Sequence, residues 1–199
     1  MKRHPHIKED DVPFSENLVF YAPLTEGDLT DHVSWASLVV NSGTVTWDTN
    51  GGYKCVGPLR NNTYIAAWNG LSLGFDITNL QFTTTYEIFY FSSPYTIPVC
   101  LGGRTFAQNI DLQLTNYKWQ RIANVLEPYD GVNLHYSHQY VDGIDKNRIS
   151  RGTSPISGSG DTNIRVELNT TSNYGSRTYI IRDIRIYNRA LNASEVAQL

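Results

Sequence analysis

Hydrophobic and polar residues alternate along short segments of the chain, with the period of two that is typical of β-strands. In the clearest segment, 82–91, Phe82, Tyr86 and Ile88 fall on one face and Glu87 falls on the other. Glycine and asparagine stand at most joints between segments, as turns require. The alternation predicts eleven strands, at 38–40, 44–47, 53–56, 63–67, 82–91, 95–101, 110–114, 119–125, 132–138, 163–168 and 178–188.

The predicted strand 178–188 is long and ends sharply. Strict alternation divides its side chains between two faces, the first holding Ile180, Arg182, Ile184 and Ile186 and the second holding Ile181, Asp183, Arg185 and Tyr187. Asn192 and Glu195 then form a capping-box pattern, in which each side chain accepts a hydrogen bond from the backbone of the other residue. A short C-terminal helix is therefore predicted.

This strand, the Tyr-Asn-Arg-Ala-Leu turn at 187–191 and the capped helix resemble the end of laminin-G-like domains, which belong to the concanavalin A-like lectin/glucanase superfamily. The segment 17–28 resembles the family's first strand and its acidic turn, and 119–125 resembles the strand that begins with tryptophan. Asp142-Gly143 is a hairpin signal where the family has a hairpin. The resemblance runs from about residue 17 to residue 199, although 71–116 matches only in strand pattern. It implies an all-β fold, a two-sheet antiparallel β-sandwich (concanavalin A-like jelly roll) with a short C-terminal helix.

Length and composition favour one folded domain. The 199 residues are 40% hydrophobic and 12% aromatic, which is enough to bury a full core. Residues 1–13 lack periodicity and contain Pro5 and Pro13, so they are predicted to form an extended N-terminal arm. The sandwich is then expected to span 14–199.

Charge and hydropathy argue against two classes of partner. The net charge is -3, and the basic residues are scattered without interleaved aromatic residues, which argues against nucleic-acid binding. The longest apolar runs, such as 88–91, are too short to cross a bilayer, so membrane insertion is not expected.

The first residues do not resemble a secretory signal, because the polar segment 4–11 stands where an apolar region would be needed. A lost signal, an intracellular protein and a bacteriophage virion protein released by lysis would each account for this. The last interpretation is favoured, which predicts an extracellular or virion-surface location.

Cys55 and Cys100 are the only cysteines of the chain. They could form a disulfide if their strands become neighbours. Two buried free thiols are the preferred interpretation.

The sequence does not predict an enzyme. Glucanases of the superfamily use a pair of glutamates on one strand, and retaining chemistry needs carboxylates about 5–5.5 Å apart. In 82–91 only Glu87 is acidic, and the chain has no Gly-x-Ser-x-Gly nucleophile motif.

The family resemblance implies a structural calcium ion near the first acidic turn and the final strand. Glu26, Asp28, Asp31 and Asp183 would supply the oxygen ligands that Ca²⁺ prefers. The family commonly has Asp-x-Ser-Gly in this turn, whereas Asp-His-Val-Ser stands at 31–34 here. Solvated acids that cap the loops are the alternative.

Three predicted loops combine an aromatic ring with a polar neighbour and a following glycine, as a sugar site would need. They hold Trp68 and Asn69, Tyr129 and Asp130, and Asn173 and Tyr174. Packing of each aromatic ring over the sandwich edge is the alternative, and Trp119 is expected in the core.

These observations favour a non-catalytic carbohydrate-binding or adhesion module with a glycan or protein ligand, carried on a phage virion as a fibre or decoration protein. One alternative is a purely structural virion or assembly protein, docked onto a partner or a second copy through residues 1–13. A second alternative is a glycoside hydrolase of the glucanase type.

Overall fold

The described residues form two antiparallel β-sheets and a short C-terminal helix, and the predicted two-sheet β-sandwich is confirmed. The computed structural model describes residues 12–33, 44–56, 63–66, 81–91, 100–101, 104–105, 114–127, 136–150, 164–168 and 178–199. The arm up to residue 11, the predicted strand at 38–40 and parts of the predicted strands at 95–101, 110–114 and 132–138 fall outside these ranges. The side chains of Cys55 and Cys100 also fall outside, so their pairing stays open.

The larger sheet has the strand order β10-β9-β8-β5-β12-β3-β2, and β1 pairs with β12 beside this path. Its strands are β1 (Leu18–Ala22), β2 (Thr44–Asp48), β3 (Gly52–Val56), β5 (Phe82–Tyr90), β8 (Trp119–Leu126), β9 (Tyr136–Val141), β10 (Ile144–Ser150) and β12 (Thr178–Tyr187). The smaller sheet has the order β4-β11-β6-β7. Its strands are β4 (Thr63–Ala66), β6 (Cys100–Leu101), β7 (Arg104–Thr105) and β11 (Ile164–Leu168).

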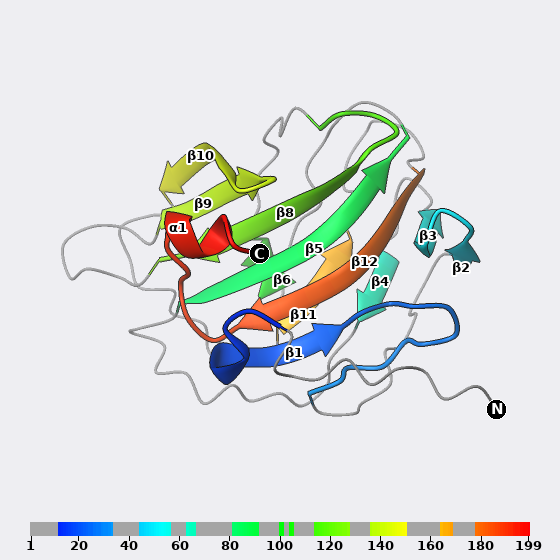
Figure 1. Cartoon of the computed structure of the whole chain (residues 1–199), viewed down its shortest axis with the longest axis horizontal. Coiled ribbons are helices and arrows are strands. Elements are labelled where there is room, and N and C mark those ends of the chain that lie inside the picture. The colour runs from blue at the N-terminus through cyan, green and yellow to red at the C-terminus, as the bar shows by residue number, and fades with distance from the viewer. Residues whose placement is uncertain are drawn as a thin grey trace.

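The main core covers one face of the larger sheet. Tyr86 and Ile122 lie directly opposite each other on β5 and β8 and are almost completely buried, as is Phe20 on β1. Burying side chains of this size contributes about 1.5–3 kcal/mol each. In Figure 1 the strands of the smaller sheet lie behind this face. The opposite face of the larger sheet, which points toward the viewer in Figure 1, is called the front face below.

A β-bulge in β12 overturns the predicted alternation of this strand. The register advances from Arg182 opposite Glu87 to Arg185 opposite Thr85, so β12 holds one extra residue. Asp183 has a left-handed backbone (φ 54), and its N–H donates to the carbonyl of Pro23 (3.1 Å). As a result Ile181, and not Ile180, shares the main core with Ile184.

The C-terminal segment folds as predicted and covers one end of the front face. Helix α1 (Ala193–Val196) begins with a complete capping box between Asn192 and Glu195. Val196 packs in a second apolar cluster with Tyr187 and Tyr140 on this face. In the described part of the chain, no helix is long and apolar enough to cross a membrane.

The predicted hairpin also forms. Asp142 and Gly143 both have positive φ angles (51° and 75°) and join β9 to β10. The strand β10 was not among the predicted strands, because its polar run at 145–148 shows no regular alternation.

Replacing Asn192 with alanine removes the acceptor for the Glu195 N–H. We expect the free energy of unfolding to fall by about 1 kcal/mol, the usual contribution of a helix N-cap. Urea denaturation monitored by tryptophan fluorescence measures the change. The exposed Lys146→Ala serves as control, and equal stability of the two variants would show that the cap contributes nothing.

Candidate functional site

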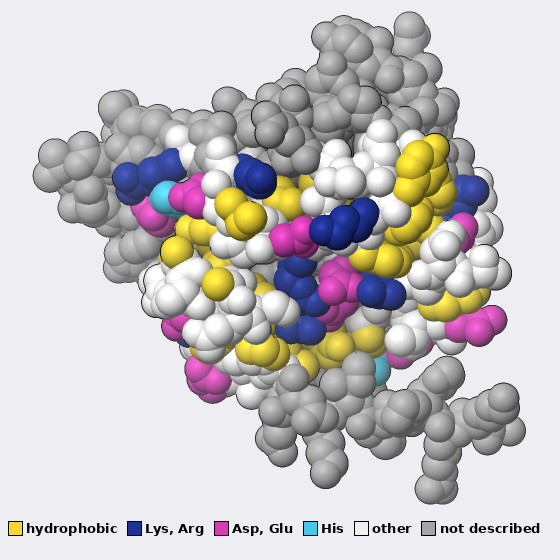
Figure 2. Space-filling model, turned by 45° about the horizontal axis from the view of Figure 1, so that its top comes forward, with side chains coloured by type: hydrophobic (Ala, Val, Ile, Leu, Met, Phe, Trp, Pro, Cys, Tyr) yellow, Lys and Arg dark blue, Asp and Glu magenta, His cyan; other side chains and the backbone are white. Residues whose placement is uncertain are grey.

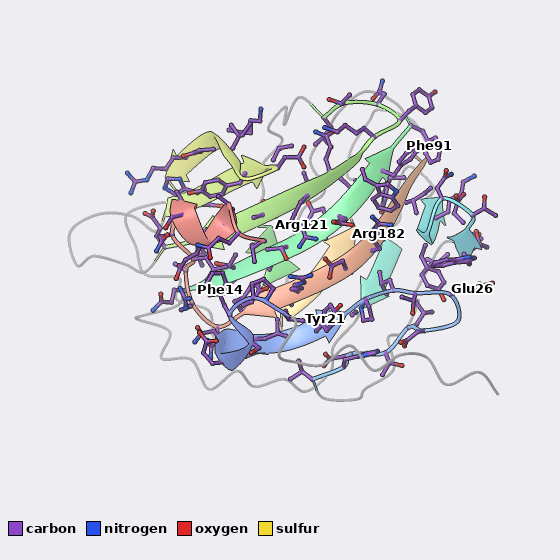
Figure 3. The ribbon with its side chains drawn as sticks, viewed as in Figure 1. Phe14, Tyr21, Glu26, Phe91, Arg121 and Arg182 are labelled. Atoms are coloured by element: carbon purple, nitrogen blue, oxygen red, sulfur yellow. The ribbon has the colours of Figure 1, made fainter. Side chains whose placement is uncertain are left out.

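Three charged side chains face one another across the middle of the front face. Glu87 on β5 lies in register between Arg121 on β8 and Arg182 on β12. Its Oε1 accepts a hydrogen bond from Arg121 Nη2 (2.7 Å), and its Oε2 accepts one from Arg182 Nε (2.6 Å). Figure 3 shows Arg121 and Arg182 above the central strands of the sheet.

The bulge in β12 adds Asp183 and Arg185 to this group. Asp183 Oδ2 accepts from the same Arg121 Nη2 (2.7 Å). Arg185 donates two hydrogen bonds to the same carboxylate, from Nε (2.9 Å) and from Nη2 (2.8 Å). This paired geometry makes arginine–carboxylate contacts strong. We call Glu87, Arg121, Arg182, Asp183 and Arg185 the front-face network. Figure 2 shows acidic and basic side chains gathered in the middle of this side of the molecule.

Glu87 and Arg185 keep their charges at neutral pH. Burial alone would raise the pKa of Glu87, but the hydrogen bonds and charges of Arg182 and Arg121 outweigh it and hold the pKa below its ordinary value. Burial likewise opposes the charge of Arg185, yet Asp183 raises its pKa. Burial also raises the pKa of Tyr21, which lies beside Arg185, to about 12.

Three guanidinium groups and two carboxylates leave the network one positive charge in excess. Arg121 Nη1 is buried and has no hydrogen-bond partner among the described residues. Arg182 is the most open member, with 37% of its side chain exposed. The network therefore keeps donor capacity that its own carboxylates do not use.

Aromatic rings lie at one end of the network. Phe89 contacts both Trp119 and Phe91, with centroids 5.7 Å and 5.3 Å apart, and Phe91 contacts Tyr117 (6.0 Å). Tyr117 is 68% exposed and has a left-handed backbone (φ 58) that is uncommon for a tyrosine. We call Phe89, Phe91, Tyr117 and Trp119 the aromatic rim.

Trp119 is not in the core, contrary to the prediction. As the first residue of β8 it lies opposite Phe89 on the front face and is only partly buried. The Arg182 guanidinium lies 4.0 Å from its ring centroid, a cation–π contact that joins the rim to the network. A Cβ on Gly52 would come within 3.1 Å of Trp119 Cη2 and 2.7 Å of the Ile181 carbonyl, so glycine permits this close packing.

The six residues predicted to bind sugar lie outside the described residues, and that prediction stays untested. They are Trp68, Asn69, Tyr129, Asp130, Asn173 and Tyr174.

The four predicted calcium ligands have separate surroundings. Asp31 is fully buried and its Oδ1 accepts from the backbone of Tyr21 (2.9 Å) and Val33 (3.0 Å). Asp28 pairs with His32 (2.7 Å), Asp183 belongs to the network, and Glu26 is exposed in the loop after β1. In the described part of the chain no three His, Cys, Asp or Glu side chains form a group that could hold a metal. Calcium binding stays a prediction.

The structure also brings together two carboxylates that are far apart in sequence. Glu87 and Asp183 each have an oxygen 2.7 Å from Arg121 Nη2, so the two carboxylates are close neighbours, and paired carboxylates are what a glycosidase requires. Both are bound by guanidinium groups, and the lowered pKa of Glu87 is opposite to the raised pKa that a general acid needs.

Comparisons with known proteins support the fold. No protein family and no curated protein matches the sequence. Domain 4 of AbnA, a GH43 extracellular arabinanase from Geobacillus stearothermophilus in complex with arabinotriose, is 15% identical, with a TM-score of 0.59 over 92% of this chain and 97% of that one.

Two larger proteins contain a similar sandwich. A botulinum neurotoxin type C structure, described with two ganglioside molecules in cell entry, is 12% identical with a TM-score of 0.61. Trypanosoma rangeli sialidase in complex with sialic acid is 14% identical with a TM-score of 0.56. The alignments cover 92% and 91% of this chain, but only 50% of the toxin chain and 32% of the sialidase chain. At these identities the likeness shows a shared β-sandwich fold.

Replacing Glu87 with glutamine tests the electrostatics of the network. Because the pKa of Glu87 is lowered on folding, its ionised form stabilises the protein above the ordinary pKa of 4.5, and this stabilisation is lost as pH falls through the folded value. We expect Glu87→Gln to cost about 1–2 kcal/mol at pH 7, and the difference from wild type to shrink in acid.

Urea denaturation across the pH range measures this difference, with the exposed Glu26→Gln as a matched control. The control should stay within about 0.5 kcal/mol of wild type at every pH. A Glu87→Gln effect that is independent of pH would show that the charge of Glu87 does not stabilise the fold.

Proposed function

We propose that this protein is a non-catalytic recognition module that binds a carbohydrate on its front face. The proposal rests on one observation: the aromatic rim lies directly beside the hydrogen-bonding groups of the network, and the stack of Arg182 on Trp119 joins them. Sugar rings present an apolar side, which aromatic rings can cover, and hydroxyl groups, which charged and polar side chains can bind.

The exposed ring of Tyr117 and its neighbour Phe91 provide the stacking surface, because Arg182 already covers Trp119. The left-handed backbone conformation of Tyr117 is energetically unfavourable. Residues held in such conformations cluster at functional sites. An exposed tyrosine held in this way is more readily explained by ligand contact than by stability.

Glycan-related structures among the neighbours support this proposal. They contain arabinotriose in the arabinanase domain and sialic acid in the sialidase, and two ganglioside molecules are named for the toxin. Their ligands belong to those proteins, but they show that similar sandwiches occur in proteins that handle carbohydrate.

A binding role also agrees better with the two central carboxylates than catalysis does. Glu87 and Asp183 are held by three arginines, so neither is placed to exchange protons with a substrate. A location outside the cell or on a virion surface fits this role, with residues 1–13 as a docking arm onto a virion partner or a second copy. We further propose that the chain is a laminin-G-like domain and that it binds a calcium ion.

Binding to an array of neutral and acidic glycans tests the proposal. We expect Tyr117→Ala to weaken each wild-type interaction about two- to tenfold, since an aromatic contact is worth about 0.5–1.5 kcal/mol, while Tyr117→Phe keeps its affinity. Ile144→Ala removes another exposed hydrophobic side chain, on β10, and should change nothing. Full affinity in Tyr117→Ala would overturn the proposed surface, and hydrolysis of a glycan that is lost in Glu87→Gln would favour the glycosidase alternative.

A further inference from the structure

The front-face network and Lys54 together carry an excess of positive charge, although the chain as a whole carries a net charge of -3. The network contributes one positive charge in excess, and Lys54 adds another. Lys54 lies opposite Ile180 in the pairing of β3 with β12, and its Nζ is 5.8 Å from the Phe91 ring centroid. None of the ion pairs among the described residues uses Lys54. Two cations, Lys54 and Arg182, therefore border the aromatic rim.

Arg182 is held in place although much of its side chain is exposed. Its guanidinium stacks on Trp119 at 4.0 Å, its Nε donates to Glu87 Oε2 (2.6 Å), and its Nη1 donates to the carbonyl of Gly51 (3.3 Å). An exposed arginine normally loses conformational entropy when it binds a ligand. These three contacts have already fixed Arg182, so little further entropy is lost.

The fixed guanidinium still has donors to offer. Of the five N–H groups of an arginine, the two hydrogen bonds of Arg182 use one on Nε and one on Nη1. Among the described residues, no acceptor uses Nη2 or the second N–H group of Nη1. The outward N–H groups of Nη1 and Nη2 form the end of a guanidinium that planar anions bind in pairs. The nearest carboxylate, Glu87, is already bound by two arginines.

We propose that the front face selects an acidic glycan, with Arg182 and Lys54 receiving an anionic substituent of a sugar whose ring stacks on Phe91 and Tyr117. The substituent is a carboxylate or a sulfate ester, which share the charge and the acceptor oxygens that this site recognises. This inference rests on the proposed carbohydrate-binding function and adds its specificity. Trp119 and Glu87 are positioning residues for Arg182.

The test compares the wild-type protein on an array in which neutral glycans stand beside their acidic forms. Suitable sets are lactose with its 3′-sialylated and 3′-sulfated forms, and oligogalacturonate with its methyl ester. We expect binding to the acidic members, weakening as salt concentration rises. Binding to the sialylated glycans or to galacturonate would identify a carboxylate as the recognised group, and binding to the sulfated form would identify a sulfate.

Variants of the protein then identify the residues that bind the anionic substituent. We expect Arg182→Gln to weaken binding of acidic glycans about ten- to hundredfold, since a hydrogen bond to a charged group contributes about 1.5–3 kcal/mol. Lys54→Gln lies outside the network and gives a second test that does not disturb Glu87. Arg148→Gln removes the same charge on β10, beside Glu127, and should bind as wild type does.

The possible outcomes separate the two proposals. Preference for neutral glycans with sensitivity to Tyr117→Ala would overturn the acidic specificity and keep the proposed function. Acidic glycans bound equally by wild type, Arg182→Gln and Lys54→Gln would place the anion elsewhere and overturn this inference. No binding to any glycan by folded wild-type protein would overturn both proposals.

Discussion

The extra residue in β12 determines what each face of the larger sheet presents. Before the bulge, Tyr179 and Ile181 point into the main core, and after it Ile184 and Ile186 do so. A shift of one residue exchanges the faces of a strand. Without the bulge, either Tyr179 and Ile181 or Ile184 and Ile186 would therefore point to the front face, and one arginine of β12 would point into the core. The left-handed backbone of Asp183 absorbs this extra residue, and its N–H leaves the sheet to bond Pro23 in the loop after β1.

The same bulge makes the half-buried charges tolerable. Removing a charged side chain from water is costly unless it is paired and hydrogen-bonded. Bulging at Asp183 brings its carboxylate within reach of Arg121 and Arg185, while Arg182 remains opposite Glu87. Every carboxylate oxygen of the network therefore accepts at least one hydrogen bond from a guanidinium. Arg182, the most exposed member of the network, keeps donors that no described residue uses.

The sequence predicts the fold well where a local pattern suffices. Capping by Asn192 and Glu195, the Asp142-Gly143 hairpin and the central strand from Phe82 each depend on neighbouring residues, and the structure confirms them.

The strand β10 was missed because its edge position leaves it polar. The network was missed because Glu87, Arg121 and Asp183 meet through strand order and a bulge, and neither can be read from alternation. The one available signal was the presence of charged residues inside three predicted strands. Trp119 was misplaced for a related reason, since its face depends on the register with Phe89.

Chemical-shift mapping by NMR would test the central claim, that ligand is recognised on the front face, most directly. Titrating the ¹⁵N-labelled protein with oligogalacturonate or a sialylated oligosaccharide should shift the side-chain N–H signals of Trp119 and Arg182 and the backbone signals of Tyr117 and Phe91. Shifts confined to the loops around Trp68, Tyr129 and Tyr174, with the front face unchanged, would contradict the account and place the site in the loops that the sequence predicted.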